Sequence, residues 1–424
     1  MLLMASLPFD RFYSHLILIS LFIHTLIHLK RSAIKPVFIL HNLVLQSVFF
    51  ITVLSTIYSI NRTEGFNEWG KDSIILLLPI LFCLNPLDLV KCRDKLLLSF
   101  ALVCTATIIY LYLDAFITIR HYGLPFRSLF SAAFTNHNFS EPIQMHATFF
   151  SMQVTIAFAY MIYAFFKASS NYHRLVCGLC GLVLDCGLIQ LSSKSIFIVL
   201  ILIVNVAVPY LLLKGSIRWK YLLASAFVSI CLLIGILNTG TFKERFVNEL
   251  KTDLAKPSSA EVSDGRLARW QVVTGLIKKS PVVGYGAGSE IGLLQDGFFS
   301  HKLYNSYLFR LNSHSQYLSF WLKSGIIGLL IYLFTLGYGF NIALRQKDFI
   351  LCVFMLIIAV ISFSENVLDV DKGVFFYAFF FTFFIYSSQR KTQKNVTPIM
   401  AINNTNLKKP LSSTQPQEAA INQL

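Results

Sequence analysis

Repeated apolar segments of membrane-spanning length constrain the fold of this chain most strongly. They recur from Tyr13 to Leu237 and resume at His314. A helix that crosses a bilayer needs about twenty predominantly apolar residues, and these segments reach that length. They lack the short alternating pattern of barrel strands, so helices are the spanning structure that satisfies their backbone in lipid. The sequence therefore predicts an all-α polytopic membrane protein.

The apolar runs mark about eleven or twelve transmembrane helices. We place spans at 13–29, 37–60, 72–89, 96–119, 143–166, 175–191, 195–213, 219–237, 314–340, 348–363 and 373–388. The opening residues Met1–Pro8 resemble the end of a further helix whose beginning is missing, as in a truncated gene model. Only 13% of the 424 residues are charged, whereas a soluble domain has about a quarter. The 39 Phe against 4 Trp suggest lipid-facing helices that need bulk without polarity.

Basic residues in the connecting loops predict the orientation. The loops on one side carry sixteen Lys and Arg, and the short loops on the other side carry seven. The positive-inside rule places the richer side in the cytoplasm. The N-terminus and the loops at 61–71, 120–142, 192–194 and 364–372 then face outward. Because orientation accounts for most of the net charge of +15, nucleic-acid binding is not expected.

A long polar insert divides the chain. Residues 1–237 form an N-terminal set of transmembrane helices and 314–388 a C-terminal set, with a large, partly helical outward loop at 238–313. Residues 389–424 are rich in Asn, Thr, Gln, Ser and Pro and lack apolar periodicity, which predicts a disordered cytoplasmic tail. A bilayer protein has no energetic reason to keep such an insert between two spans, so we expect the insert to be functional.

Two arginines in the insert form a candidate anion site. Ser263 or Asp264 is expected to cap a helix over Gly265–Lys279. Arg266 and Arg269 are three residues apart and share a face near its start. Guanidinium groups beside the positive end of a helix dipole suit phosphate. The alternative is a solvated helix face whose arginines pair with nearby acids.

His314 and Lys194 are the other principal candidates. His314 lies at the outer membrane boundary in 312–317 (NSHSQY), where an imidazole that titrates near neutrality can act as a general base. Lys194 lies between two apolar runs with no carboxylate nearby in sequence, which is costly unless it meets an anion. The alternatives are an interface anchor for His314 and a Lys194 that reaches lipid phosphate.

Other polar residues give weaker signals. The segment 284–288 (GYGAG) superficially resembles a dinucleotide loop, but no βαβ unit surrounds it, so a tight turn is expected. Glu365, Asp369 and Asp371 form an acidic outer loop without regular metal-ligand spacing. Ion pairing with Lys372 or the arginines is therefore expected rather than a metal site.

Three further polar groups lie closer to the spans, and none of them predicts a site by itself. Asp185 lies inside a span and should face the helix bundle. His137 lies on the outer loop, and His146 begins the following span. None of the eight cysteines falls in the insert, and no disulfide framework is implied.

The order of these pieces resembles the O-antigen ligase and polymerase superfamily of bacterial envelope enzymes. The matching segments are 266–270 (RLARW), 280–288 (SPVVGYGAG) and 312–328 (NSHSQYLSFWLKSGIIG). Residues 364–376 look like the version found in Bacteroidetes-type members. The resemblance covers most of residues 30–388.

This resemblance implies a glycosyltransferase of GT-C-like architecture in the bacterial inner membrane, with its active site facing the periplasm. Such enzymes take a glycan from undecaprenyl diphosphate. Ligases pass it to lipid A–core, and polymerases pass it to another lipid-linked repeat unit. Family members have a histidine at the position of His314 and an arginine at the position of Arg266. A second family arginine is replaced here by Lys194, which keeps the charge but loses bidentate geometry.

The site residues then predict a metal-independent, inverting transfer that needs no cofactor. Arg266 and Lys194, together with Arg269, would bind the diphosphate and stabilise the charge of the leaving group. His314 would take the proton from the acceptor hydroxyl. The expected partners are a lipid-linked glycan donor, a lipid A–core or lipid-linked glycan acceptor, and membrane lipids. Ligase and polymerase both remain open, and the alternatives from other classes are a transporter for an anionic lipid or sugar and a non-catalytic assembly factor.

Overall fold

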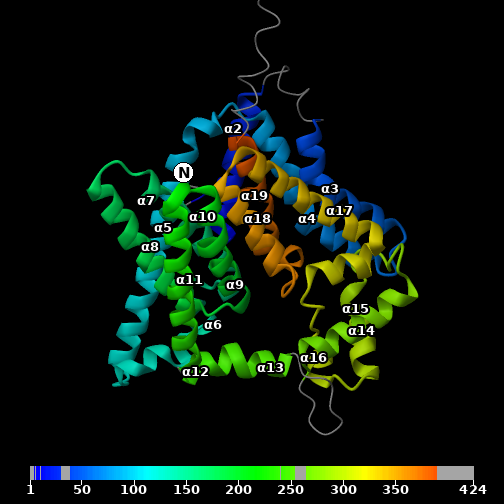
Figure 1. The fold of residues 1–424 in the computed structure, drawn as a ribbon. Helices are drawn as coiled ribbons and strands as arrows, with labels where there is room; N and C mark the ends of the chain where they lie inside the picture. The colour runs from blue at the N-terminus through cyan, green and yellow to red at the C-terminus, as the bar shows by residue number, and fades with distance from the viewer. Residues whose placement is uncertain are drawn as a thin grey trace, which may run out of the picture. The chain divides into compact units, whose positions relative to one another are not determined.

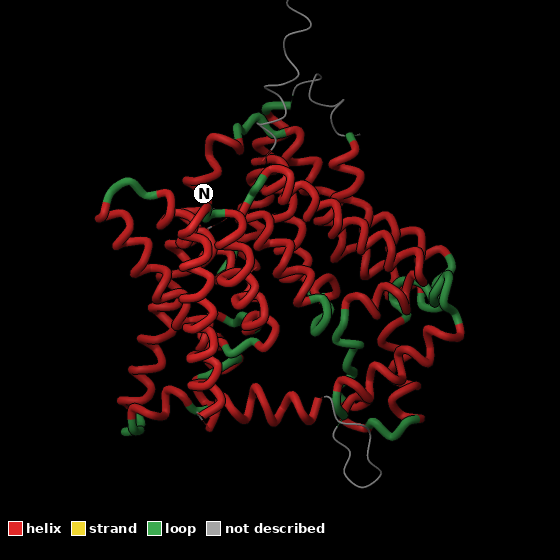
Figure 2. Tube along the Cα trace, viewed as in Figure 1, coloured by secondary structure: helices red, strands yellow, loops and turns green. Residues whose placement is uncertain are grey.

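The structure, a computed structural model, describes most of the chain up to Ser388. The described residues are 4, 6–9, 11–29, 39–238, 240–253 and 264–388. The predicted tail at 389–424 and the predicted cap Ser263 lie outside them. All regular secondary structure in the described residues is helical, as Figure 2 shows. The predicted all-α class is confirmed.

Each predicted span corresponds to a helix or a run of helices (Figure 1). These helices are α2 (Arg11–Ile27), α3 (Leu40–Ile57), α4 (Arg62–Leu84), α5 (Leu89–His121), α7 (Ala147–Lys167), α8 (Asn171–Leu191), α9 (Lys194–Leu202), α10 (Val208–Leu211), α11 (Gly215–Asn238), α17 (Gln316–Gln346), α18 (Phe349–Ile361) and α19 (Asp371–Ser388). A π-helical segment, Ile203–Ala207, joins α9 to α10. Before α7 the chain forms the short helix α6 (His137–Ser140).

Seven helices or helix runs in the described residues are long and apolar enough to cross a membrane. They are Leu40–Ile57, Leu89–His121, Ala147–Lys167, Asn171–Leu191, Lys194–Leu211, Gly215–Gly235 and Gln316–Gln346. Two shorter apolar helices, Leu16–Ile27 and Phe349–Ile361, add to them. The chain is therefore a polytopic membrane protein, and the number of eleven or twelve crossings stays a prediction.

The insert consists of short helices. They are α12 (Gly240–Lys243), the π-helical segment η7 (Glu244–Asn248), α13 (Glu249–Asp253), α14 (Arg266–Lys279), α15 (Glu290–Ser300) and α16 (Tyr304–Leu308). The core of α14 and α15 includes Val273 and Phe298, and Leu322 of α17 joins the same apolar cluster. The insert is therefore packed against the start of α17.

Helix α19 occupies the centre of the helix bundle. It contacts α3, α4, α5, α7, α17 and α18. Its phenylalanines pack against one another and against Phe354 of α18, and Phe380 and Phe384 have no exposed surface. For this helix the expectation of lipid-facing phenylalanines is wrong, because the rings fill the space where six helices meet.

Helix α17 is broken at Gly325, where the sequence predicts a single continuous span. Gly325 has φ of +63°, in the left-handed region that favours glycine. The break frees two carbonyl groups, and the turn of the insert binds them: the Tyr285 N–H donates to Leu322 O at 3.0 Å and the Gly286 N–H donates to Lys323 O at 2.7 Å. The segment 284–288 is thus a tight turn that docks on a helix break, as the sequence predicts for a turn rather than a nucleotide loop.

Loops predicted to face outward contact one another. The Lys372 ammonium donates to Gln144 O at 2.7 Å, two residues after the loop at 120–142. Ser195, the residue after the turn at 192–194, shares a hydrogen bond with Ser364. At the predicted cytoplasmic ends of α5 and α18, Arg93 forms a bidentate pair with Asp348 at 2.6 and 2.7 Å. These contacts therefore join loops that the orientation prediction assigns to the same side.

Candidate active site

His314 lies on a backbone that its neighbours hold in an unusual conformation. Its φ is +46°, a left-handed geometry that is costly for a residue with a side chain. Trp270 of α14 donates its indole N–H to Ser313 O at 2.9 Å. Glu290 accepts the Ser313 N–H at 2.9 Å, and Asn312 accepts the His314 N–H at 3.0 Å. The insert thereby fixes the backbone that presents His314.

A buried polar network supports this backbone from the other side. Asn366 accepts the Ser315 N–H at 2.8 Å and donates to Glu290 at 3.1 Å and to Asp369 at 2.6 Å. Asp369 also pairs with Lys323 at 2.8 Å, and the Lys323 side chain is only 7% exposed. Because these groups share partners and all but Asp369 are buried, a change in one member disturbs the others.

Glu365 links His314 to Arg266. One carboxylate oxygen lies 3.4 Å from His314 Nδ1, and the other lies 3.7 Å from Arg266 Nη2. Burial alone would raise the pKa of this carboxyl, but its contact with His314 and the positive charge of Arg266 lower the pKa below its usual value. The expected ion pairing of the acidic loop with an arginine is confirmed for Glu365.

Lys194 joins the same group of charges through the insert. Its ammonium lies 3.2 Å from Glu249 and 3.3 Å from Asp253 of α13. The same Asp253 oxygen lies 3.9 Å from Arg266 Nε. Contacts therefore run from Lys194 through Asp253, Arg266 and Glu365 to His314, so the structure brings three of the four predicted site residues together.

Arg269, the fourth predicted site residue, is buried. Only 6% of it is exposed, which contradicts the alternative of a solvated arginine face. Its Nε and Nη1 have no hydrogen-bond partner among the described residues. Burial and the charge of Arg266 lower its pKa. The Arg269 guanidinium is therefore close enough to Arg266 for the two charges to interact. Its two unpaired nitrogens do not reach the surface.

Asp264 is not the cap of α14, so this part of the cap prediction is wrong. Gly265 is the N-cap residue and no side chain caps the helix. The Asp264 carboxylate instead accepts the backbone N–H of Ser306 in α16. Asp264 thus ties two helices of the insert together through one carboxylate oxygen, while its other oxygen has no hydrogen-bond partner among the described residues.

Arg245 and a pair of histidines also lie among these loops. Arg245 donates its Nε–H to Ser192 O at 2.8 Å, in the turn that carries Lys194. The rings of His137 and His146 are 4.1 Å apart. In the sequence alone, the charged residues of 243–253 are typical of a solvated helix. Only their spacing of three and four residues indicates that they share one helix face.

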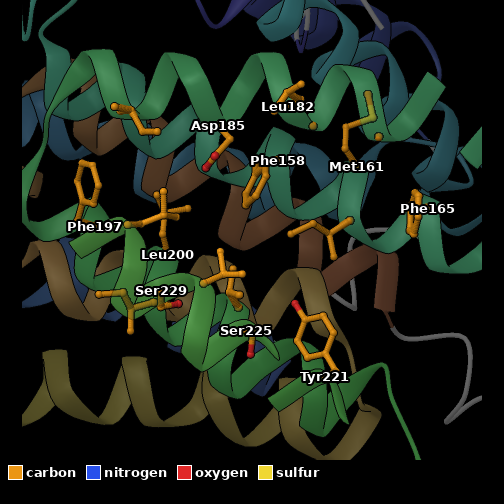
Figure 3. A pocket seen from close by; sticks show the side chains of 18 of the residues that line it. Phe158, Met161, Phe165, Leu182, Asp185, Phe197, Leu200, Tyr221, Ser225 and Ser229 are labelled. Atoms are coloured by element: carbon orange, nitrogen blue, oxygen red, sulfur yellow. The ribbon is translucent and has the colours of Figure 1, made fainter. Parts of the chain in front are cut away.

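An apolar cavity of about 490 Å³ lies between α7, α8, α9 and α11. Figure 3 shows Phe197 and Phe165 on opposite sides of the view, with Asp185 among apolar side chains. Asp185 thus faces the bundle, as expected. Phe197 packs edge-on against Phe246 of η7 at 4.7 Å and lies one helical turn after Lys194. One end of the cavity is therefore next to the cations of the site.

Comparison with known protein families finds a match for part of the chain. Residues 178–333 match the model of a family described as O-antigen ligase. The resemblance to the O-antigen ligase and polymerase superfamily is confirmed. The matched range includes Lys194, Arg266 and His314, whereas Glu365 lies outside it. No curated protein matches the chain. The family indicates glycan transfer of the ligase or polymerase type, with lipid-linked glycans as substrates in general.

Proposed function

We propose that this protein transfers a glycan from undecaprenyl diphosphate to a hydroxyl group of lipid A–core, at the periplasmic face of the inner membrane. The observation that carries the proposal is the line of contacts from Lys194 to His314. It supports the proposal because cations of a kind suited to phosphate lie close to a candidate base. A transferase that separates a diphosphate from a sugar needs both groups at one site.

His314 is the proposed general base. The Glu365 carboxylate faces His314 Nδ1, which favours the tautomer with its proton on Nδ1 and makes Nε2 the nitrogen that would accept the proton. As the acceptor oxygen bonds to the anomeric carbon, its proton passes to Nε2. The bond from that carbon to the diphosphate oxygen breaks, and undecaprenyl diphosphate leaves with the electron pair. Direct displacement inverts the configuration of the anomeric carbon.

The cations stabilise the leaving group. Negative charge develops on the diphosphate oxygen as its bond to the sugar breaks, and fixed positive charges lower the energy of that transition state. Arg266 and Lys194 are partly exposed and can contact the diphosphate, whereas the buried Arg269 would act through its charge. We therefore expect transfer in the absence of divalent metal ions.

The apolar cavity between α7, α8, α9 and α11 is the proposed binding place for the first isoprene units of the donor. Its lining is apolar apart from a few groups such as Asp185 and Tyr221. Its end at Phe197 adjoins the turn that carries Lys194. A diphosphate on Lys194 would thus leave its lipid tail at the mouth of the cavity.

Transfer in proteoliposomes tests the proposal. Purified protein receives undecaprenyl-diphosphate glycan and lipid A–core in buffer containing a chelator. We expect glycan on lipid A–core with the wild type and a loss of about a thousandfold with His314→Ala or Arg266→Ala. His301→Ala is the matched control, because His301 is exposed outside this line of contacts.

Other outcomes separate the alternatives. Longer lipid-linked chains with untouched lipid A–core would make the protein a polymerase. Full activity of His314→Ala would remove the base from the mechanism. Absence of transfer to either acceptor, from protein with an intact melting transition, would favour a transporter.

A further inference from the structure

Two carboxylates of α13 occupy the spaces between the site cations. Glu249 Oε2 lies 3.2 Å from Lys194 Nζ and 3.7 Å from Arg245 Nη1. Asp253 Oδ2 lies 3.3 Å from Lys194 Nζ and 3.9 Å from Arg266 Nε. Glu249 and Asp253 are four residues apart, so they lie one helical turn from each other. Each of these two oxygens is therefore shared by two cations.

Arg245 is held so that its guanidinium faces this group. Its Nε–H donates to Ser192 O at 2.8 Å, which leaves the two terminal nitrogens for other partners. Its side chain is 23% exposed. Burial and the nearby charge of Arg266 lower the pKa of Arg245, and Glu249 raises it. Arg245 is thus a third cation beside Lys194 and Arg266, fixed at one end by the backbone of the turn.

The ion-paired charges of this group balance without a substrate. Lys194, Arg245 and Arg266 face the carboxylates of Glu249, Asp253 and Glu365. A diphosphate added beside all of them would meet carboxylates as well as cations, and like charges at such distances repel strongly in a partly buried site. An anion enters favourably only if it replaces carboxylates already bound to the cations.

We infer that the donor diphosphate displaces Glu249 and Asp253 and binds in a cradle made by Lys194, Arg245 and Arg266. The inference rests on the proposed function and adds Arg245 to its binding residues. Glu249 Oε2 and Asp253 Oδ2 each lie between two cations, and their positions mark where the two phosphoryl groups would bind. Glu249 and Asp253 are then built-in competitors that hold the cations in place while the site is empty.

The same exchange serves product release. Undecaprenyl diphosphate keeps both phosphoryl groups after the sugar has left, so the cradle would hold it as tightly as the donor. Return of Glu249 and Asp253 to the cations assists its departure. Removal of these carboxylates should therefore tighten product binding and slow turnover.

Binding of undecaprenyl diphosphate to the full chain in nanodiscs tests the inference. Glu249→Gln and Asp253→Asn should each bind it about tenfold more tightly than the wild type, because each variant removes a competing ion pair. Arg245→Gln should bind about tenfold more weakly, and Arg245→Lys should lie between it and the wild type. Asp296→Asn, at an exposed position of α15, is the control for the loss of one negative charge and should change affinity less than twofold.

The outcomes distinguish this inference from the proposed function. Unchanged or weaker binding by the Glu249→Gln/Asp253→Asn double variant would overturn the inference, as would wild-type affinity in Arg245→Gln. If transfer still depended on Arg266 and His314, the proposed function would stand in either case. Failure of the wild type both to bind undecaprenyl diphosphate and to transfer glycan would overturn the two together.

Discussion

His314 depends on residues from several separate segments of the chain. Trp270 and Glu290 from the insert fix the backbone of Ser313, and Glu365 from the loop after α18 faces the imidazole. A left-handed backbone at a residue with a side chain persists only where its surroundings enforce it. The position of the ring is thus a product of tertiary contacts.

Replacement of Glu365 by Gln should change how stability depends on pH. The lowered pKa of Glu365 means that its ionised form stabilises the folded protein at pH above about 4.5. That contribution is lost as the pH falls through the lowered folded value. Glu365→Gln should therefore melt at lower temperature at pH 7 and lose less stability than the wild type below pH 4.5.

Melting temperatures of purified protein between pH 3 and pH 7 check this expectation. Glu141→Gln is the matched control, because Glu141 is exposed and forms no ion pair with His314 or Arg266 among the described residues. Parallel pH curves for Glu365→Gln and the wild type would contradict the stabilising role of this carboxylate.

The sequence predicts the site residues whose chemistry is visible locally. His314 and Lys194 stand out as titratable or charged groups at apolar boundaries, and Arg266 stands out by its spacing from Arg269 near a helix start. Asp253 and Glu249 do not, because their charges lie in a segment that reads as a solvated helix. Their partner Lys194 is more than fifty positions earlier, and a contact at that separation is decided by tertiary packing.

Among the elements, α17 departs most from its predicted form. Its sequence is apolar over most of 314–340, although Lys323 and Ser324 precede Gly325, and glycine is frequent in membrane helices. The break arises because residues 281–286 of the insert dock against it, and Ile326 N–H donates to Pro281 O at 2.9 Å. A helix pattern read alone cannot show that a distant turn replaces the hydrogen bonds of the helix.

Gly325→Ala should destabilise the protein by about 3 kcal/mol or more, since it combines left-handed strain with a steric clash. A Cβ atom at this position would lie 1.9 Å from Val282 O. Gly337→Ala in the same helix is the control, because a Cβ there meets nothing within 4 Å. Thermal unfolding in detergent measures both, and equal melting temperatures would mean that α17 is not broken.

At the scale of the whole molecule, the sequence predicts the class but not the packing. Apolar length alone requires spanning helices, and the structure confirms the all-α class. Which helix becomes central depends on how side chains interdigitate. Phe380 and Phe384 of α19 are buried among neighbouring helices, although a phenylalanine side chain is equally suited to contact with lipid.

The pair of Arg93 and Asp348 joins α5 to α18 at the side opposite the predicted outward loops. The side chains are 17% and 10% exposed. Asp348→Asn should destabilise the protein by about 3 kcal/mol, because it leaves the Arg93 charge buried without its partner. Lys91→Gln, which removes an ion pair that is 67% and 42% exposed, should cost less than about 0.5 kcal/mol. Thermal unfolding of both variants checks the difference.

The two oxygens of Glu365 have a consequence for the order in which substrates react. One oxygen faces Arg266 and the other faces His314. A donor diphosphate bound to Arg266 would compete with Glu365 for the positive charge of the guanidinium. The carboxylate would then be held mainly by His314 and would orient the imidazole more firmly. We therefore expect an acceptor that arrives before the donor to meet a less firmly held ring, so that its hydroxyl becomes reactive only when there is a sugar to receive it.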